Sequence, residues 1–581
     1  MAQMRRETTD VLVVGAGPAG LVASALLSRA GISSLTVTKY ATTADSPRAH
    51  VVNQRANEVF RDLGVLDAVM ERAMPQEMMA VQPFATSFAG REIIRMTAFG
   101  GGSRNADYRC ASPTEMCNLG QHALEPILLE AVRGFGGDVR FEHEVVSVSQ
   151  TPEQATAVVR DRRDGSEYAI DAKFVIGCDG GRSLVGEQGG FSFESRPPLG
   201  DAITVWIEAD LTRYASYRAG ALFFVCAPGS DDVLSAWTCV EPWTGWSTIF
   251  FQHGMAPIDR SEDAVLAKVR AAIDDPDVDV RIKKVRSWQV NDVVADEYRR
   301  GRLFLAGDAA HRHPPSNGLG MNTSVQDAYN LVWKLGLVLG GQAGEGLLDT
   351  YHAERRPEGR KIVDRAIRSL GEMLPFIQAL GFRGGQTYDE AMAILDHMHG
   401  PGGEEQRSAL LAATDLLNGQ FNAHGIEMGQ RYESGAVVDD GMPWPTSDRD
   451  PDLYHLPTTH PGAHLPHVWL ERDTRPISSI DLCDYGRFTL IVGSDGQDWV
   501  TAAETVSAEL GIRIEPVSVG LGQAHNDTLC AWTRTRETTD RGCVLVRPDR
   551  FVAWRSAGAV ADPASTLREA MAQVLDRPAA P

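Results

Sequence analysis

The chain begins with a short apolar run, a glycine-rich turn and an apolar helix. Val11–Val14 is wholly apolar, Gly15–Gly20 has the spacing G-x-G-x-x-G, and Leu21–Arg29 has a helical composition. A second apolar run, Ser34–Thr38, follows Gly31, a residue that suits the end of a helix. This pattern predicts a β-α-β unit, whose parallel strands are covered on both faces.

Two later apolar runs, Phe174–Gly177 and Leu303–Ala306, each lead into a turn of Gly and Asp. They predict further strands of the same sheet, assembled from distant parts of the chain. Between them, residues 201–256 alternate in short segments and hold four of the eleven tryptophans. Such segments predict an antiparallel sheet inserted into the parallel one, and its aromatic residues suit a pocket for a flat, apolar ligand.

The second half of the chain begins with helices. Residues 328–379 have helical spacing, and residues 439–461 have the Pro and Asp content of connecting loops. The last part predicts a separate β/α unit with strands at 488–493 and 513–519, helices at 499–510 and 565–576, and a hairpin around 548–549. This order resembles a thioredoxin-like fold, but it lacks the C-x-x-C pair that redox work would require.

Composition narrows the possible classes of protein. The chain has 56 basic and 77 acidic residues and a net charge of −21, which disfavours binding to nucleic acid or to an anionic membrane. Its eight cysteines have no metal-binding spacing and indicate a reducing compartment. Gly15, Gly17, Pro18 and Gly20 interrupt the first apolar stretch, so neither a signal peptide nor a membrane span is expected there. We therefore expect a cytoplasmic protein.

The Gly15–Gly20 turn predicts a dinucleotide site. Between a strand and a helix, such glycines let backbone N–H groups approach a pyrophosphate at the helix N-terminus. An acidic residue is expected about twenty positions later to bind the ribose, but this chain has Thr38, Lys39 and Tyr40 there. Because Lys39 could suit a 2′-phosphate, this motif alone leaves FAD and NADPH as comparable alternatives.

Two further segments decide between these cofactors. One is Cys178-Asp179-Gly180, and the other runs from Gly307-Asp308 through Pro314-Pro315 to Asn317-Gly-Leu-Gly-Met-Asn322. With these segments the chain resembles the single-component FAD-dependent aromatic hydroxylases. The resemblance is strongest to the branch of phenol hydroxylase and 2,4-dichlorophenol 6-monooxygenase, and it covers nearly the whole chain.

This resemblance implies an α/β fold. It comprises a Rossmann-like FAD-binding domain at 1–200 and 291–400, an inserted antiparallel-sheet substrate domain at 201–290, a helical and loop connector at 401–463, and a thioredoxin-like domain at 464–581. The implied enzyme uses FAD, NADPH or NADH, and O₂ to hydroxylate a phenol-like ring ortho to a hydroxyl, by way of a flavin C4a-hydroperoxide. Its expected partner is a small aromatic substrate, and it is expected to form a homo-oligomer.

The resemblance also implies roles for individual residues. Asp308 would bind the ribityl and pyrophosphate region of FAD, Gln121 the ribityl chain and Arg48 the phosphates. Gly186 stands where the family usually has Arg, which puts a nicotinamide contact from this segment in doubt. The full cofactor set expected is Gly15, Gly17, Pro18, Ala19, Gly20, Thr38, Lys39, Tyr40, Arg48, Gln121, Val145, Cys178, Asp179, Gly180, Asp308, Pro315, Gly318, Gly320, Met321 and Asn322.

His50 is the candidate catalytic base, because it falls where phenol hydroxylase has an active-site acidic residue. Its unperturbed pKa of about 6.5 suits a group that accepts the phenol proton, and a phenolate is the better nucleophile. A loop His bonded to backbone is the alternative interpretation. Expected substrate contacts are Trp206, Phe224, Trp237 and Pro314. No metal is expected, since the flanking glycines already explain Asp308 without a triad that includes His311 and His313.

Two other functions stay open at this point. The same branch contains natural-product tailoring enzymes, including a hydroxylase of the piericidin type that acts on a hydroxypyridine. The atypical Thr38 and Lys39 also leave room for an FAD-binding dehydrogenase or a flavoprotein that does not hydroxylate.

Overall fold

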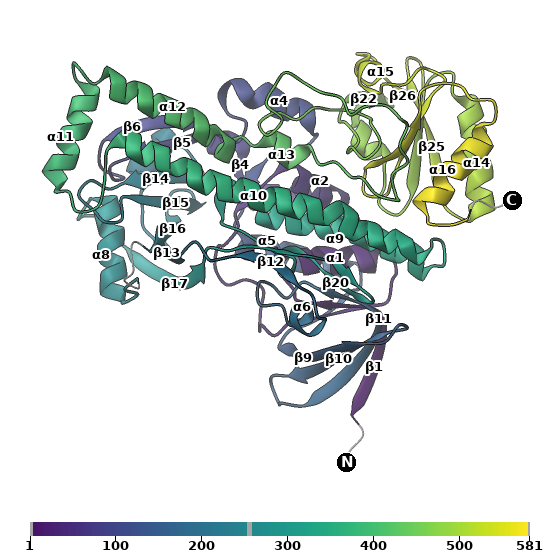
Figure 1. Cartoon of the computed structure of the whole chain (residues 1–581), viewed down its shortest axis with the longest axis horizontal. Coiled ribbons are helices and arrows are strands. Elements are labelled where there is room, and N and C mark those ends of the chain that lie inside the picture. Colours follow the sequence, from purple (N-terminus) through teal and green to yellow (C-terminus); the bar gives the residue numbers. More distant parts are fainter. Residues whose placement is uncertain (1–3, 253–257, 579–581) are drawn as a thin grey trace.

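The computed structural model describes residues 4–252 and 258–578; the ends of the predicted first and last domains and the end of the alternating 201–256 segment lie outside them. The predicted parallel sheet is present, in the order β19-β20-β11-β1-β2-β8 (Figure 1). Strands β11 and β2 flank β1 in parallel register, and β20 pairs in parallel with β11. The strands are β1 (Arg5–Val14), β2 (Ser34–Val37), β8 (Asp138–Arg140), β11 (Glu167–Gly177), β19 (Arg299–Arg300) and β20 (Leu303–Leu305).

Strands β1 and β11 are longer than their apolar cores. The polar first half of β1 pairs with Tyr168–Ala172 of β11, and β10 and β9 continue the sheet antiparallel from there. Two small sheets lie beside the parallel one. Their strands and those of the extension are β9 (His143–Gln150), β10 (Ala155–Asp161), β3 (Val51–Val52), β4 (Met74–Pro75), β7 (Cys117–Asn118), β12 (Phe193–Arg196), β18 (Asp292–Ala295) and β21 (His311–Arg312).

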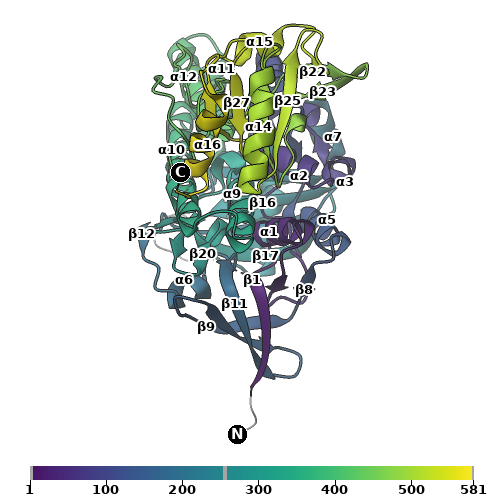
Figure 2. The same ribbon diagram turned by 90° about the vertical axis from the view of Figure 1, so that its right-hand side faces the viewer.

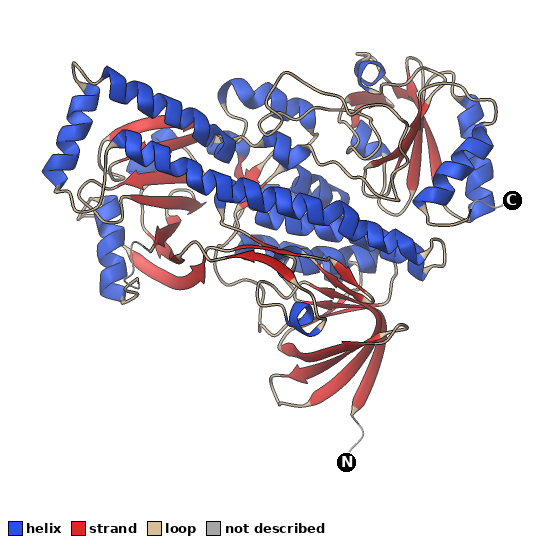
Figure 3. Ribbon diagram, in the orientation of Figure 1, coloured by secondary structure: helices blue, strands red, loops and turns tan. Residues whose placement is uncertain are grey.

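Helices α1 (Pro18–Arg29), α5 (Gln121–Gly134) and α9 (Gly320–Leu339) pack together over this sheet. The predicted helical region 328–379 is in fact α9 followed by α10 (Asp349–Leu380), the long helix that crosses the molecule in Figure 3. Helix α9 begins at Gly320, eight residues before the start of the apolar helical spacing at Ala328. Its first turns are polar, yet they are buried and hydrogen-bonded within the protein, as Asn322 is to the carbonyl of Val51.

A seven-stranded sheet contains the predicted antiparallel strands in the order β17-β13-β16-β15-β14-β5-β6. Two of its strands, β5 and β6, come from upstream of the segment in which the sheet was predicted. Helix α8 accompanies this sheet, as do α11 and α12 (Figure 1, left). The elements are β5 (Val81–Ala85), β6 (Glu92–Thr97), β13 (Asp201–Glu208), β14 (Leu222–Cys226), β15 (Leu234–Glu241), β16 (Gly245–Phe251), β17 (Arg281–Gln289), α8 (Glu262–Ile273), α11 (Tyr388–His399) and α12 (Glu404–Phe421).

The C-terminal residues form a third sheet, in the order β23-β22-β26-β25-β24-β27-β28. Figure 2 shows α14 and α16 in front of it. The predicted strands, helices and hairpin are all found, the hairpin as β27 and β28. The elements are β22 (Trp469–Arg472), β23 (Arg475–Ser478), β24 (Phe488–Val492), β25 (Ile514–Gly520), β26 (His525–Asn526), β27 (Cys543–Val546), β28 (Val552–Ser556), α14 (Gln497–Leu510), α15 (Ala531–Thr535) and α16 (Pro563–Val574).

The remaining helices connect these three sheets. They are α2 (Gln54–Asp62), α3 (Leu66–Arg72), α4 (Asn105–Ala111), α6 (Leu184–Gln188), α7 (Thr212–Ala215) and α13 (His424–Met428). Within residues 4–252 and 258–578, none of the helices has the length and apolar character needed to cross a membrane.

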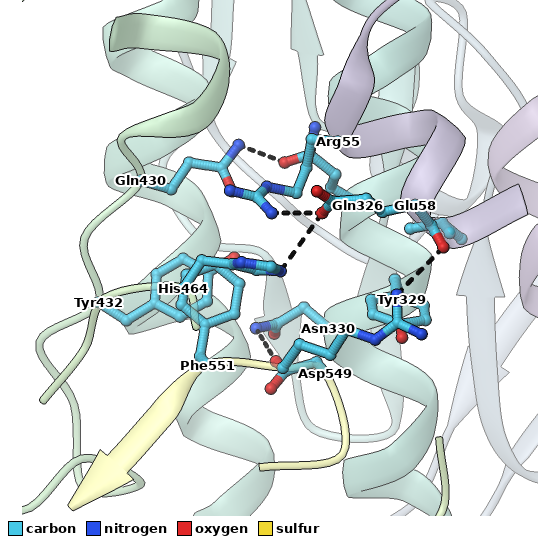
Figure 4. Close-up of a pocket in the computed structure, with 12 residues that line it drawn as sticks. Arg55, Glu58, Gln326, Tyr329, Asn330, Gln430, Tyr432, His464, Asp549 and Phe551 are labelled. Atoms are coloured by element: carbon cyan, nitrogen blue, oxygen red, sulfur yellow. Dashed lines mark hydrogen bonds and ion pairs between the residues drawn. The ribbon is translucent and has the colours of Figure 1, made fainter. Parts of the chain in front are cut away.

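The C-terminal sheet meets α2 and α9 through buried polar side chains. Figure 4 shows a pocket at this junction, where the β27–β28 hairpin faces α2 and α9. Arg550 of the hairpin donates to the carbonyl of Glu58 at 3.2 Å, and Asn330 of α9 donates to Asp549 at 3.2 Å. The ring of Phe551 stacks on Tyr432 with centroids 3.9 Å apart. The junction is therefore specific and polar.

Next to the pocket, Glu354 of α10 is the centre of a buried ionic network. Its two oxygens accept from Arg547 at 2.6 and 2.8 Å, and Lys334 donates to it at 2.7 Å. The side chains of all three residues have 0% exposure. Because both cations have no access to water, their charges depend on this carboxylate.

We expect Glu354→Ala to lower the free energy of unfolding by about 3–5 kcal/mol, because it leaves Lys334 buried without a carboxylate partner and Arg547 with Asp549 alone. The measurement is urea denaturation followed by tryptophan fluorescence. Glu509→Ala is the matched control, since it breaks a 2.8 Å pair with Arg568 that lies at the surface. The control should cost at most about 1 kcal/mol, and equal losses in the two variants would contradict the assignment.

Candidate active site

The Gly15–Gly20 turn passes so close to β11 that side chains cannot be accommodated. A Cβ on Gly15 would lie 2.2 Å from the carbonyl oxygen of Cys178, and Gly15 also has φ +108°. A Cβ on Gly20 would lie 2.0 Å from the carbonyl oxygen of Gly15. Helix α1 then starts at Pro18, and no side chain caps its N-terminus. The turn thus presents free backbone N–H groups, as a pyrophosphate requires.

The corner at Gly307 and Asp308 adjoins this turn. Gly307 has φ +61°, and a Cβ there would lie 3.4 Å from the Cβ of Ala19. Asp308 is exposed beside it. Two motifs almost 300 residues apart in the sequence therefore meet at one place, as their assignment to a single cofactor requires.

Asp327 holds this corner in place, a role that the sequence did not reveal. One of its oxygens accepts from the backbone N–H of Gly307 at 3.0 Å and from His311 Nε2 at 2.9 Å. The other accepts from Arg355 Nε at 2.8 Å. Burial acts to raise the pKa of Asp327, but Arg355 and His311 hold it below its ordinary value. The network also explains His311 without a metal, and among the described residues no cluster of His, Cys, Asp or Glu could hold one.

The start of α9 is the third part of the site. Asn322 accepts from the N–H of Asn53 at 3.0 Å and donates to the carbonyls of Val51 and Gly318 at 2.9 and 2.7 Å. No side chain caps this helix at Gly320, so its first N–H groups are available. Close to Gly320 in the sequence, Pro314 and Met321 are buried, whereas Pro315 is exposed. Asn322 therefore ties the helix start to the segment that carries His50.

Gln121 lies at the start of α5, where a second unpredicted carboxylate holds it. Its amide donates to Glu125 Oε1 at 2.5 Å, and the N–H of Ala44 donates to Oε2 at 2.5 Å. Glu125 Oε1 is also 4.0 Å from the position of a Cβ on Gly17. Burial raises the pKa of Glu125. The only sequence signal for Glu125 is its spacing of one helical turn from Gln121.

Several predicted cofactor residues make other hydrogen bonds or lie in the protein core. Asp179 accepts from Ser183 Oγ at 2.5 Å and from the N–H of Val185 at 3.1 Å, so both of its oxygens are used at the start of α6. Val145 is a core residue of β9, the strand whose first residue, His143, donates to the carbonyl of Thr38 at 2.9 Å. Thr38, directly after β2, is buried, and the next two residues, Lys39 and Tyr40, are exposed. Arg48, further along the chain, is also exposed. Gly180 has φ +80° in the turn after β11.

The imidazole of His50 contacts two side chains, Asn118 on β7 and Thr238 on β15 of the antiparallel sheet. Its Nδ1 is 2.7 Å from Asn118 Oδ1, and its Nε2 is 3.3 Å from Thr238 Oγ1. The amide of Asn118 donates through Nδ2 to the carbonyl of Cys239 at 2.7 Å. That carbonyl can only accept, so the amide oxygen must face His50, and Nδ1 must carry the imidazole proton. Nε2 then has the lone pair that a base needs, and here this lone pair accepts from the hydroxyl of Thr238.

The surroundings of His50 keep its imidazole neutral. Burial lowers the pKa of His50 to about 4, although the hydrogen bond to Asn118 acts in the opposite direction. The alternative of a loop His bonded only to backbone is not what the structure has, because both ring nitrogens meet side chains.

The register of the sheet places two of the predicted aromatic residues on the face that meets His50. Phe224 pairs with Ala236, two residues from Thr238, and Trp206 pairs with Ser247, which pairs with Thr238. Trp237 points to the opposite face, is fully buried and packs edge-on against Phe88 at 5.1 Å. Its predicted substrate contact is wrong, because side chains alternate between faces along a strand.

Together these features define the class of protein. Three parts of the chain form a cradle for an elongated dinucleotide: the turn before α1, the corner at Asp308 and the start of α9. A Cβ on Gly15 or Gly20 would clash with backbone atoms there. These residues fit FAD, and His50 with its sheet lies beside the start of α9. The arrangement is that of a flavoprotein.

Comparison with known proteins identifies the family. Residues 8–366 match the FAD binding domain and residues 458–578 the C-terminal domain of aromatic-ring hydroxylases. The chain is 42% identical to 2,4-dichlorophenol 6-monooxygenase of Delftia acidovorans, over 98% of each chain. It is 40% identical to phenol 2-monooxygenase of Pseudomonas sp. (strain EST1001), over 96% of this chain and 91% of that one.

A crystal structure of the flavin-dependent monooxygenase PieE with FAD and substrate is similar throughout, with a TM-score of 0.95, 45% identity, and coverage of 98% of this chain and 100% of that one. The chain therefore belongs to the FAD-dependent aromatic-ring hydroxylases. It is an FAD-dependent monooxygenase, which implies NAD(P)H and O₂ as co-substrates.

We expect Gly20→Ala to reduce FAD affinity at least about tenfold, because the new methyl group would overlap the Gly15 carbonyl and push the turn apart. The measurement is the dissociation constant from quenching of FAD fluorescence. Gly371→Ala, in open space on α10, is the control and should bind FAD like the unchanged protein. Normal FAD affinity in Gly20→Ala would refute this assignment of the turn.

Proposed function

We propose that this protein hydroxylates a phenol-like ring, ortho to its hydroxyl group. The observation that carries the proposal is the lone pair of His50 Nε2, whose tautomer Asn118 fixes. A substrate hydroxyl would take the place of Thr238, the present donor to this nitrogen. When bound, FAD supplies the activation of O₂ with electrons from NAD(P)H. The names of the relatives, which act on phenol and dichlorophenol, support the substrate class.

The protein's part of the reaction is to orient the ring and to accept a hydrogen bond from its hydroxyl. A phenol has a pKa of about 10, and the imidazole of His50 has a pKa of about 4, so complete proton transfer would cost on the order of 8 kcal/mol. His50 therefore acts mainly as a hydrogen-bond acceptor. It polarises the O–H bond of the substrate and so increases the electron density of the ring. Substrates with a more acidic hydroxyl, such as chlorinated phenols, are the better match.

The sheet face supplies the apolar surroundings of the ring. Phe224 is buried and stacks on Phe84 at 4.6 Å, and Trp206 is half-buried two strands away from Thr238. We assign Phe224, Trp206 and Pro314 to the substrate side of the site. We assign the turn glycines, Gln121, Arg48, Asp308 and the start of α9 to FAD.

A second candidate is a tailoring hydroxylase that acts on a hydroxypyridine of a natural product. The 0.95 TM-score and 45% identity with PieE favour it. The same chemistry at His50 would serve, since a hydroxypyridine also presents an acidic hydroxyl on a ring. A screen of phenols and hydroxypyridines, with product identified by mass spectrometry, separates the two.

We also propose that the C-terminal unit has a thioredoxin-like fold. Strand order β25-β24-β27-β28 supports this, with β24 and β25 parallel and the other two pairs antiparallel. The chain's eight cysteines are free, which supports the proposal of a cytoplasmic enzyme. We further propose that it acts on a small aromatic partner and forms a homo-oligomer.

We expect His50→Ala to retain FAD affinity within about twofold while slowing hydroxylation about 10²-fold, because the acceptor for the substrate hydroxyl is lost. Product formation is measured by chromatography together with NADPH oxidation, and the missing product should appear as hydrogen peroxide. His397→Ala is the control, since that residue is exposed near the end of α11. Unchanged product formation in His50→Ala would remove His50 from the mechanism.

The pH dependence offers an independent test. Because the pKa of His50 is lowered to about 4, its neutral form persists well below pH 6.5, and the acidic limb of kcat should lie near pH 4. Asn118→Asp places a carboxylate against Nδ1 and should raise this pKa by about 1–3 units. The limb should move to higher pH by the same amount. A limb that stays in place in Asn118→Asp argues against titration of His50.

A further inference from the structure

Strand β17 carries four cationic residues and no acidic one, although the chain as a whole has a net charge of −21. It is an edge strand of the antiparallel sheet, paired only with β13. Two of its cations, Lys284 and Arg286, have side-chain exposures of 33% and 37%, so they can meet a ligand from solvent. Nothing in the proposed chemistry at His50 uses them.

The register places these two cations on the face of the sheet that His50 meets. Thr238 pairs with Ser247, Ser247 with Trp206, and Trp206 with Lys284, so the four form one row across four strands. Arg286 is two residues from Lys284 and therefore points to the same side. With about 4.8 Å between neighbouring strands, the row spans roughly 14 Å from the partner of His50 to Lys284.

Both cations are tied to the loop that borders the flavin cradle. Asp45 accepts from Lys284 and from Arg286, the latter at 2.5 Å. The preceding residue, Ala44, donates to Glu125 beside Gly17. Lys284 and Arg286 hold the pKa of Asp45 below its ordinary value, although its side chain is 56% exposed. A carboxylate of the chain's own loop thus occupies the place where two cations would hold an anionic ligand.

We propose that Lys284 and Arg286 bind the phosphates of NAD(P)H, which displace Asp45 from them. Both side chains are donors suited to phosphate, and Arg can make two parallel bonds to it. The ribose and diphosphate of a dinucleotide can bridge the row between its nicotinamide ring and these cations. The proposal deepens the proposed function, on which it rests for the position of the reacting ring.

Another interpretation is that the ion pairs only fasten the loop over the cradle. The two interpretations differ in the effect of Asp45. If Asp45 competes with a phosphate, its removal frees the cations and improves nucleotide binding. If it fastens the loop, its removal has the same harmful effect as removal of the cations.

The test compares Lys284→Gln/Arg286→Gln with Asp45→Asn in the FAD-loaded enzyme. The readouts are anaerobic flavin reduction in a stopped-flow instrument over a range of NADPH and NADH concentrations, and equilibrium titration with NADP⁺. The double variant should raise the apparent Kd for NADPH at least about tenfold, since charge-assisted bonds to phosphate are lost. Asp45→Asn should lower it about two- to fivefold, and added salt should weaken binding most in Asp45→Asn.

Arg281→Gln is the matched control, because it removes a cation from the same strand that pairs with Glu208 and not with Asp45. It should change the Kd for NADPH by less than about twofold. The proposal is overturned if Asp45→Asn and the double variant change nucleotide affinity in the same direction, if the double variant loses FAD, or if only the KM of the aromatic substrate rises. Flavin reduction needs no hydroxylated product, so these results stand even if the proposed substrate is wrong.

Discussion

The close approach of the Gly15–Gly20 turn to the end of β11 is the constraint on which the flavin cradle depends. A side chain at Gly15 or Gly20 would overlap backbone atoms at about 2 Å, so the turn can pack only as glycine. That packing brings Ala19 against Gly307 and so joins the two motifs. Asp327 then fixes the corner by accepting from the N–H of Gly307, and its own charge is held by Arg355 and His311. The geometry of the cofactor site is thus set by backbone contacts and buried ion pairs.

Burial suits His50 to its proposed role and also limits that role. The same loss of water that shelters a reactive flavin lowers the pKa of the imidazole, so His50 is neutral but weakly basic. The hydrogen bond of Asn118 selects the useful tautomer, and the carbonyl of Cys239 fixes Asn118. A site of this kind favours rings with acidic hydroxyl groups, which agrees with the dichlorophenol-hydroxylating relatives.

The C-terminal unit is connected by side-chain contacts to the residues that hold the corner at Gly307. Phe551 stacks on Tyr432, whose hydroxyl accepts from Arg355, and Arg355 donates to Asp327. Contacts therefore run without interruption from the C-terminal hairpin to the corner at Gly307. The buried network around Glu354 ties the same hairpin to α9 and α10. The C-terminal unit therefore helps to hold α9 and α10, the long helices that carry Asp327 and Arg355.

The sequence by itself determined the β-α-β unit, the strands of the parallel and C-terminal sheets, the glycine turn and the Asp308 corner. These follow from local patterns, namely apolar runs, glycine spacing and turn residues. It did not show that the polar first turns of α9 are buried, because residues such as Asn322 are satisfied by hydrogen bonds that only the folded chain supplies. Nor did it reveal Asp327, Glu125 or Asn118, whose partners lie far away in the sequence, or which face of its strand Trp237 occupies. Alternation along a strand says which residues share a face, but only the packing of other elements on the sheet decides which face meets the core and which meets the ligand.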